Sequence, residues 1–327
     1  MVRRPTQSDV ARVAGVSRGA VSLALSGSPG VGEETRARIR TVADELGYVR
    51  NLGAAALAGQ FESALGVVLP DLRNPFFESL VAEIQHRGVG IDRLPLFVTA
   101  QDDPEQEMMV MRKLHELRVA GIVAVSPVSA SEHLVEMARA LPIAVVGAEP
   151  VGAGVDVVHM DEDLAARLIA DHVRDGGWKR VLHLSGMPGA GDVWVERRRR
   201  ALAAVFTDVP FTHVTVRGDD IIRPVIEAQG LGDPEGLAIV AHNDLIAMDV
   251  VTAARSLGLV PGRDVAIIGF DDTHMAARPE FSLTSIHQDA GDLSQIALDM
   301  LRDRASDPSL PERESVLAPT LTVRSSS

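Results

Sequence analysis

TQSDVARVAGVSRGAVSLALS, residues 6–26, reads as two short helices joined by a tight turn. Thr6 followed three residues later by Asp9 is typical of a capping box, which opens a helix. Gly15 suits the left-handed backbone at a helix end, and Ser17 is placed to cap a second helix over residues 18–25. The stretch therefore predicts a helix-turn-helix, whose second helix enters the major groove of DNA.

The second helix carries the residues that are expected to meet DNA. Arg18 is the candidate base reader, because a guanidinium can bond O6 and N7 of guanine together, although a phosphate contact or a surface ion pair would also use it. Serine hydroxyls suit phosphate oxygens, whereas Leu23 can touch only a thymine methyl group. Any small helical hairpin shares this pattern, so the stretch alone leaves DNA binding open. The candidate contacts are Thr6, Ser17, Arg18, Gly19, Ala20, Ser22, Leu23 and Ser26.

A third amphipathic helix is predicted over residues 33–46, with Ile39 and Leu46 on its apolar face. It completes a head of residues 1–47. Residues 48–60 then form a linker in which Asn51 can cap the short segment 52–58. A helix this short is marginal alone in water, and Gly53 weakens it by roughly 1 kcal/mol relative to Ala.

Charge separates the head from the rest of the chain. The whole chain has a net charge of −13, but residues 1–60 hold eight Arg against five acidic residues, and the remainder carries −16. Only the first segment suits phosphates, and each neutralised phosphate releases a counterion, so binding should weaken steeply with salt.

Residues 61–327 form the body, in which apolar runs alternate with helix-length amphipathic segments. This alternation predicts a doubly wound parallel α/β fold, and the number of runs favours two Rossmann-like lobes. Ligands in such folds bind beyond the carboxyl ends of the strands, where carboxylates and amides would suit a polyhydroxyl ligand. The predicted strands are 64–70, 94–100, 121–126, 143–148, 181–185, 237–241 and 265–270, and the predicted helices include 76–87, 105–117 and 245–257.

The order of motifs resembles the LacI/GalR (lactose-repressor) family of bacterial transcription regulators over essentially the whole chain. The residues that carry the resemblance are DVARVAGVSRGAVSLALSG, ETRARIRTVADELGYVRN, AAALAG, GVVLPDLRNPFFESLVAEI, IVAHNDLIAMDVVTAARSLGLVPGRDVAIIGFDD, LTSIHQD and the closing APTLTVRSS. The resemblance implies a helix-turn-helix head and a periplasmic-binding-protein-like body. It also implies three crossings between the lobes, near Asp161, Asp289 and Pro319, so that lobe 1 comprises 61–160 and 290–318 and lobe 2 comprises 161–289 and 319–327.

The resemblance also assigns roles to the linker. In the family, two such hinges of a dimer fold together in the minor groove, where Leu57 aligns with a leucine that wedges between base pairs. Asn51 and Ala54 are the other candidate DNA contacts there, although a plain flexible linker is the alternative. Many members carry Arg where this chain has Leu23, Asn where it has Ser26, and Pro where it has Arg50. The operator sequence therefore does not transfer from relatives.

The resemblance places Arg198, Asn243 and Asp271 at the effector. The run 196–200 could instead be a solvated helix face, and Asp244 is expected to cap the helix that follows it. Many sugar-binding members carry Asp or Asn where this chain has Gly147. Phe76 could form part of the pocket wall or only pack, and Trp194 could stack on a sugar or only cover its loop. The full candidate set is Asp71, Phe76, Ser126, Asp161, Trp194, Arg198, Asn243 and Asp271.

The absence of Cys excludes disulfides and thiolate metal sites, and no catalytic motif is evident, so an enzyme, a metal or a cofactor is not expected. No apolar run is long enough for a secretory leader or a membrane span, so a cytoplasmic protein is expected. The expected function is a homodimeric transcription regulator, a repressor, that binds a near-palindromic operator and is controlled by a small molecule. A sugar is the first expectation for that molecule and a nucleobase the second. The rival interpretation is a sugar-binding transport protein that ignores DNA.

Overall fold

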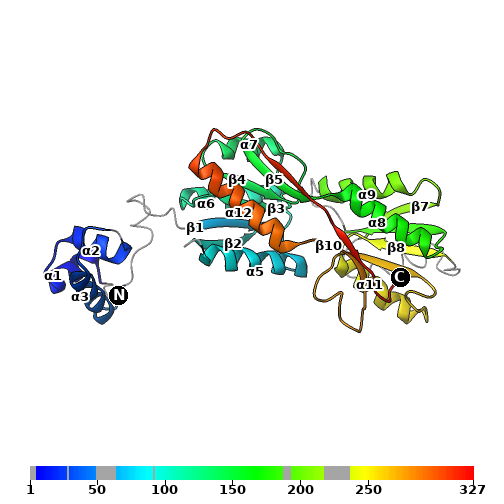
Figure 1. Ribbon diagram of the computed structural model, residues 1–327, viewed down its shortest axis with the longest axis horizontal. Coiled ribbons are helices and arrows are strands. Elements are labelled where there is room, and N and C mark those ends of the chain that lie inside the picture. The colour runs from blue at the N-terminus through cyan, green and yellow to red at the C-terminus, as the bar shows by residue number, and fades with distance from the viewer. Residues whose placement is uncertain (1–4, 28, 49–63, 91–92, 187–192, 217–235) are drawn as a thin grey trace. The chain divides into compact units, whose positions relative to one another are not determined.

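The computed structural model describes residues 5–27, 29–48, 64–90, 93–186, 193–216 and 236–327. The chain divides into two compact units, Met1–Phe61 and Glu62–Ser327, and Figure 1 shows the elements of each. The described residues of the first unit form α-helices, whereas those of the second form two sheets with helices on their faces.

The head contains α1 (Gln7–Ala14), α2 (Arg18–Ser26) and α3 (Glu33–Glu45). The predicted capping box is confirmed, since the Thr6 side chain accepts from the Asp9 amide and the Asp9 side chain accepts from the Thr6 amide. Gly15 ends α1 with a φ of 67°, and Ser17 Oγ accepts from the Ala20 amide at 3.1 Å. Local caps and a left-handed turn thus set both boundaries of the helix-turn-helix.

The three helices meet in one small apolar core. Val10, Val21 and Ile39, one from each helix, are fully buried. Val16 and Leu25 are partly buried and pack against this core. The seam between the helices is therefore apolar, and α2 keeps exposed residues, among them Arg18 and Leu23, outside it.

The first sheet of the body has the strand order β11-β5-β4-β3-β1-β2, with parallel pairing throughout. Its central strands are fully buried, as the apolar runs predicted. Helices α5 and α12 pack on one another and on one face of this sheet, around Leu80, Ile84 and Leu301. The elements are β1 (Ala64–Leu69), α5 (Pro75–Gly90), β2 (Leu94–Thr99), α6 (Pro104–Glu116), β3 (Ile122–Val125), α7 (Ser131–Ala138), β4 (Ile143–Val146), β5 (Val155–Met160), α12 (Ala290–Ser306) and β11 (Glu314–Leu317).

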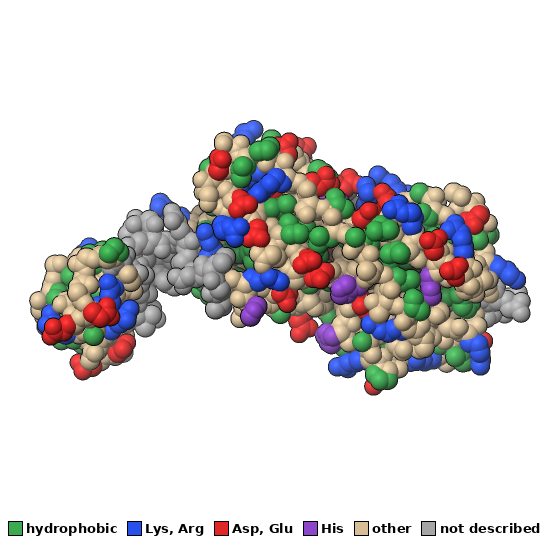
Figure 2. All heavy atoms as spheres, viewed as in Figure 1, with side chains coloured by type: hydrophobic (Ala, Val, Ile, Leu, Met, Phe, Trp, Pro, Cys, Tyr) green, Lys and Arg blue, Asp and Glu red, His purple; other side chains and the backbone are tan. Residues whose placement is uncertain are grey.

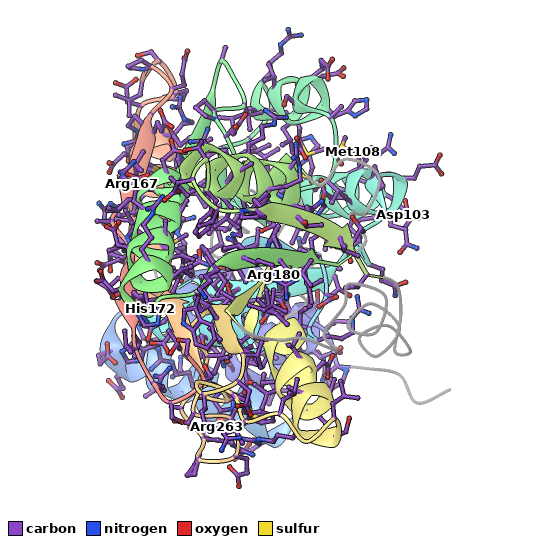
Figure 3. The ribbon with its side chains drawn as sticks, turned by 90° about the vertical axis from the view of Figure 1, so that its right-hand side faces the viewer. Asp103, Met108, Arg167, His172, Arg180 and Arg263 are labelled. Carbon is purple, nitrogen blue, oxygen red and sulfur yellow. The ribbon has the colours of Figure 1, made fainter. Side chains whose placement is uncertain are left out.

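The second sheet has the order β12-β10-β9-β8-β6-β7, and β12 alone runs antiparallel, beside β10. Its core contains Ile169, Phe270 and Ile286. His172 on α8, labelled in Figure 3, lies 2.8 Å from the Ser327 hydroxyl through Nε2, which ties α8 to the last residue. The elements are α8 (Glu162–Asp175), β6 (Arg180–Ser185), α9 (Val193–Val205), β7 (Phe211–Thr215), β8 (Leu237–Ala241), α11 (Asp244–Ser256), β9 (Ala266–Asp271), β10 (Thr284–His287) and β12 (Thr320–Thr322).

The chain passes between the two lobes at three places: between β5 and α8, between β10 and α12, and between β11 and β12. Each lobe is therefore built from separate parts of the sequence. In Figure 1 the last passage is the red segment that runs from β11 toward the C-terminus. The functional boundaries at residues 47 and 60 remain a prediction.

A buried ion cluster holds the end of α12 against lobe 1. Asp156 is fully buried and accepts from Arg304 Nε at 2.8 Å and from Arg313 Nη2 at 2.9 Å. Burial opposes ionisation of Asp156, but the hydrogen bonds from the two guanidinium groups dominate and lower its pKa. Elsewhere on the body, acidic and basic side chains are interspersed over the face shown in Figure 2.

Candidate functional site

The exposed end of α2 forms the candidate DNA-reading surface. Ser17, Arg18 and Gly19 are exposed, Leu23 is 37% exposed, and Ala20 and Ser22 are half-buried. Because Ser17 Oγ accepts the capping bond, its own O–H remains available to donate to a phosphate oxygen. The side chain of Ser26 and all of Asn51, Ala54 and Leu57 lie outside the described residues.

Thr6 is not placed as a phosphate donor. Its hydroxyl donates to Asp9 Oδ2 at 2.7 Å, and its backbone amide donates to the same oxygen at 2.9 Å. Both donors of Thr6 are thus used inside the capping box. The structure does not support Thr6 as a DNA contact, because the role in the helix cap uses the same atoms.

Arg36 also differs from the expectation for the head, in which all eight Arg of residues 1–60 suit phosphates. Its guanidinium is buried and donates from Nη1 to the carbonyls of Leu23 at 3.3 Å and Ala24 at 3.1 Å. These carbonyls belong to the last turn of α2, where the helix itself offers no donors. Arg36 therefore positions the recognition helix instead of facing DNA.

A cavity of about 420 Å³ lies between the lobes of the body. The strand ends after β1, β2, β3 and β4 line it from lobe 1, and those after β6, β8 and β9 line it from lobe 2. This is the position predicted for a ligand in open parallel sheets. Six candidate residues line the cavity: Asp71, Phe76, Ser126, Arg198, Asn243 and Asp271.

Two of these residues have a left-handed backbone, with a φ of 44° at Ser126 and 104° at Asp271. Such a backbone costs a non-glycine residue on the order of 1–3 kcal/mol, and it persists only where the surrounding structure enforces it. Both residues stand at or just after the carboxyl end of a strand. The strained positions therefore coincide with the cavity wall.

Asp271 links the two lobes across the cavity. Its Oδ2 accepts from Asn74 Nδ2 in lobe 1 at 2.9 Å, and its Oδ1 accepts from Gln288 Nε2 at 2.6 Å. Burial, together with the nearby Asp244 carboxylate, raises the pKa of Asp271 to about 7. Asp271 can thus present either an acceptor or a protonated carboxyl group at neutral pH.

Arg198 is fixed firmly at the cavity wall. Its Nε and Nη2 donate to the two carboxylate oxygens of Glu162 at 3.0 and 2.6 Å, and Nη1 donates to the His242 carbonyl. Its guanidinium carbon lies 3.2 Å from the centre of the Phe270 ring. The residue is 3% exposed, so the solvated helix face considered for this run is wrong at Arg198.

Asn243 was expected to contact the effector and Asp244 to cap α11, but the structure gives the capping role to Asn243. Asn243 is the N-cap of α11, with its Oδ1 accepting from the Ile246 amide at 3.0 Å. Asp244, which was expected to be that cap, is fully buried and accepts from Ser285 Oγ at 2.6 Å. Asn243 still lines the cavity, so its amide group is the part that remains for a ligand.

Asp161 is not among the residues that line the cavity. Its Oδ1 accepts from the Leu164 amide at 2.8 Å, which makes it the N-cap of α8. An acid directly after a strand and before a helix serves equally as a cap, and here the cap explains it. The side chain of Trp194 lies outside the described residues.

Several lining residues were not among the sequence candidates. Arg73 donates from Nε to Asp71 Oδ2 at 2.7 Å, and His242 has a buried Nδ1 that finds no partner among the described residues. Their only sequence signal is a place shortly after a strand. Gly147 lines the cavity without a side chain. Other polar lining residues that sequence reasoning missed are Asn74, Asp102, His159, Asp249 and Gln288.

Comparisons with known proteins agree with this arrangement. The family description "Bacterial regulatory proteins, lacI family" matches residues 6–51, and "Periplasmic binding protein-like domain" matches residues 170–327. The chain is 28% identical to catabolite control protein A of Priestia megaterium over 90% of both chains. No described helix is long and apolar enough to cross a membrane, and the described residues hold no cluster of three or more His, Asp or Glu side chains placed to bind a metal ion.

Two solved structures share the fold. A crystal structure of the Lac repressor dimer bound to operator and an anti-inducer matches with a TM-score of 0.84 and 21% identity over 99% of both chains. A complex of the transcriptional regulator CelR with cellobiose matches with a TM-score of 0.67 and 23% identity over 99% of this chain and all of that one. These two structures are under 25% identical to the chain and show its fold. The two family matches and the relative from Priestia megaterium, together with the capped helix-turn-helix and the interlobe cavity, show that the chain belongs to the LacI family and is a DNA-binding transcriptional regulator with a periplasmic-binding-protein-like body.

Proposed function

We propose that this protein is a cytoplasmic repressor whose homodimer binds a near-palindromic operator and is controlled by a sugar or sugar derivative in the interlobe cavity. One recognition helix α2 would enter the major groove of each half-site, with Arg18 reading a base edge. The exposed N-terminal end of α2 supports this role for Arg18. The dimer follows from the symmetry that a palindrome requires, as in the Lac repressor dimer–operator complex.

The observation that carries the proposal is the position of the cavity between two lobes joined by few polar contacts. Asn74 in lobe 1 bonds Asp271 in lobe 2, and Arg197 of α9 lies 3.2 Å from Glu149 in lobe 1. A ligand that bonds Asp271 would compete with Asn74 for its oxygens. Ligand binding would therefore change the relation between the lobes.

The linker, residues 48–60, is proposed as the element that couples the lobes to the head. The helix that the sequence predicts over residues 52–58 would be too short to persist alone, so two copies would fold together only on DNA, with Leu57 as the wedge. A coupling free energy of about 1–3 kcal/mol would change operator affinity about 5- to 150-fold.

A sugar is favoured over a nucleobase as the ligand. The cavity wall combines carboxylates and amides, such as Asp271 and Asn243, with the ring of Phe76. Neighbouring hydroxyls of a sugar can pair with such groups, while the ring covers an apolar sugar face. CelR, which shares the fold, was solved with cellobiose. The transport-protein alternative is not favoured, because it gives the head no role.

Selection from a random double-stranded DNA library at about 0.15 M salt tests the proposal. A palindrome bound at least 10³-fold above bulk DNA is expected. Arg18→Ala should weaken the preference for one base in each half-site of the selected sequence. Arg12→Ala, which removes an exposed side chain from α1, should leave the selected sequence unchanged. A library that yields no palindrome, both without ligand and with pooled sugars and purines, would contradict the proposal.

A further inference from the structure

We propose that the interlobe cavity accepts uncharged or amino sugars and rejects phosphorylated and carboxylated ones. This inference rests on the proposed function, because it names the chemical class of ligand for the same site. The charged groups in the wall, and the partners that each of them already has, support this preference.

The described wall is richer in negative than in positive groups. It contains the four carboxyl groups of Asp71, Asp102, Asp249 and Asp271 but only the two guanidinium groups of Arg73 and Arg198, and no Lys. Asp249 is exposed on α11 and faces the cavity. The two bonds to Asp271, from Asn74 and Gln288, come from neutral amides, and its pKa of about 7 leaves this carboxyl group partly ionised at neutral pH.

Neither guanidinium is placed as an anion clamp. Arg198 is bound on two of its nitrogens by Glu162, and the pair is almost fully buried, with 3% and 1% of the side chains exposed. Arg73 is bound by Asp71 and lies 3.7 Å from Asp102. A phosphate or a carboxylate is recognised best by a guanidinium fork that is free to make two parallel bonds, and here both forks already hold carboxylates.

The two His side chains and the helix N-terminus of the wall are not placed to bind an anion either. Burial, with further repulsion from Arg198 and two other His, lowers the pKa of His242 well below 6.5, so this ring is neutral. The Nε2 of His159 lies 2.8 Å from Glu314 Oε1, and its Nδ1 is 2.9 Å from the Met160 carbonyl. The N-terminus of α11, which would attract an anion, is capped by Asn243 and carries Asp244 in its first turn.

What the cavity offers instead is hydrogen bonding for neutral groups. Oδ1 of Asn243 is used in the cap of α11, and the amide nitrogen of this residue remains to donate to a ligand. Carboxylate oxygens can accept from sugar hydroxyls or from an ammonium group. A phosphate within about 6 Å of one such carboxylate meets repulsion equivalent to roughly a hundredfold in affinity at an effective dielectric constant near 20.

The test is calorimetric titration of the full chain, without DNA, by sugars in sets that share one carbon skeleton. One set is glucose, glucosamine, glucose 6-phosphate and glucuronate, and equivalent sets use galactose, mannose, ribose and cellobiose. In the set that binds, the neutral or amino member should bind at least tenfold more tightly than its phosphate and its acid. Asp249→Asn should narrow this ratio, whereas Asp171→Asn, an exposed Asp on α8 outside the cavity wall, should leave it unchanged.

Tighter binding of any phosphate or acid than of its neutral parent would overturn the inference. Failure of every neutral and amino member at about 10 mM, tenfold above the Kd of a weak binder, would overturn it too. The two proposals fail separately: a sugar phosphate that binds tightly removes only the charge rule, whereas a failed operator selection with the sugar preference intact removes only the regulator.

Discussion

Replacing Arg36 by Met should destabilise the head and thereby weaken DNA binding, although the Arg36 side chain is buried inside the head. Met keeps much of the apolar stem but loses the donors to the carbonyls of Leu23 and Ala24. A hydrogen bond from a charged group contributes about 1.5–3 kcal/mol, so the loss of two is expected to cost about 3 kcal/mol. A head of roughly 45 residues has only about 2–7 kcal/mol of stability in total.

The assay is thermal unfolding and amide hydrogen exchange of the full chain, together with operator titration. Arg36→Met should lower protection in α1, α2 and α3, leave the body unchanged, and reduce operator affinity at least tenfold. Arg38→Met is the matched control, because it removes the same charge from the same helix at an exposed position. Equal hydrogen exchange in the heads of the two variants would refute the positioning role of Arg36.

Other perturbations test separate parts of the account. Asp156→Asn leaves two guanidinium groups at a buried site without their carboxylate, so it should lower the free energy of unfolding of the body by about 3–5 kcal/mol in denaturant titration. The control Asp299→Asn, which breaks a partly exposed ion pair with Arg302, should lower it by less than about 1 kcal/mol. Between pH 3.8 and about 7 the folded chain retains a proton on Asp271 that the unfolded chain has lost, so the stability of the body should fall as pH rises through this range. Asp271→Asn should flatten this dependence of stability on pH, and an unchanged slope in the variant would count against the raised pKa. Leu57→Ala should weaken operator binding and leave sugar affinity of the DNA-free protein unchanged, and equal operator affinity would argue against a wedge. The logarithm of operator affinity should fall linearly with the logarithm of salt concentration, and a flat dependence would contradict phosphate contacts by the head.

Most strands that the sequence predicted are continuous apolar runs of sheet centres, and the edge strand β2 was also predicted because its run is apolar although half-buried. β1, β3 and β4 are buried along their whole length, so every position is apolar or small. β7 and β11 were not predicted, because each mixes polar with apolar residues and has no buried position. β5 was not predicted because Asp156 and His159 interrupt its apolar run, and both are buried with specific partners.

The part of the site that the sequence predicts is the set of residues that directly follow strands, because the carboxyl ends of parallel strands meet at one edge of a sheet. That rule places Asp71, Ser126 and Asp271 correctly in the cavity wall. It also admitted Asp161, since a carboxylate after a strand looks the same whether it faces a ligand or caps the next helix. The bond between Asn74 and Asp271 spans 197 positions, which no local pattern can reveal.

The central claim is that the cavity and the DNA-reading head are coupled, and operator affinity measured with and without a bound sugar tests it most directly. The selected palindrome and a sugar that the titrations identify are used with the full chain at about 0.15 M salt. Saturating sugar should change the operator Kd about 5- to 150-fold, and saturating operator should change the sugar Kd by the same factor. An operator Kd that stays the same with the sugar bound would contradict the account.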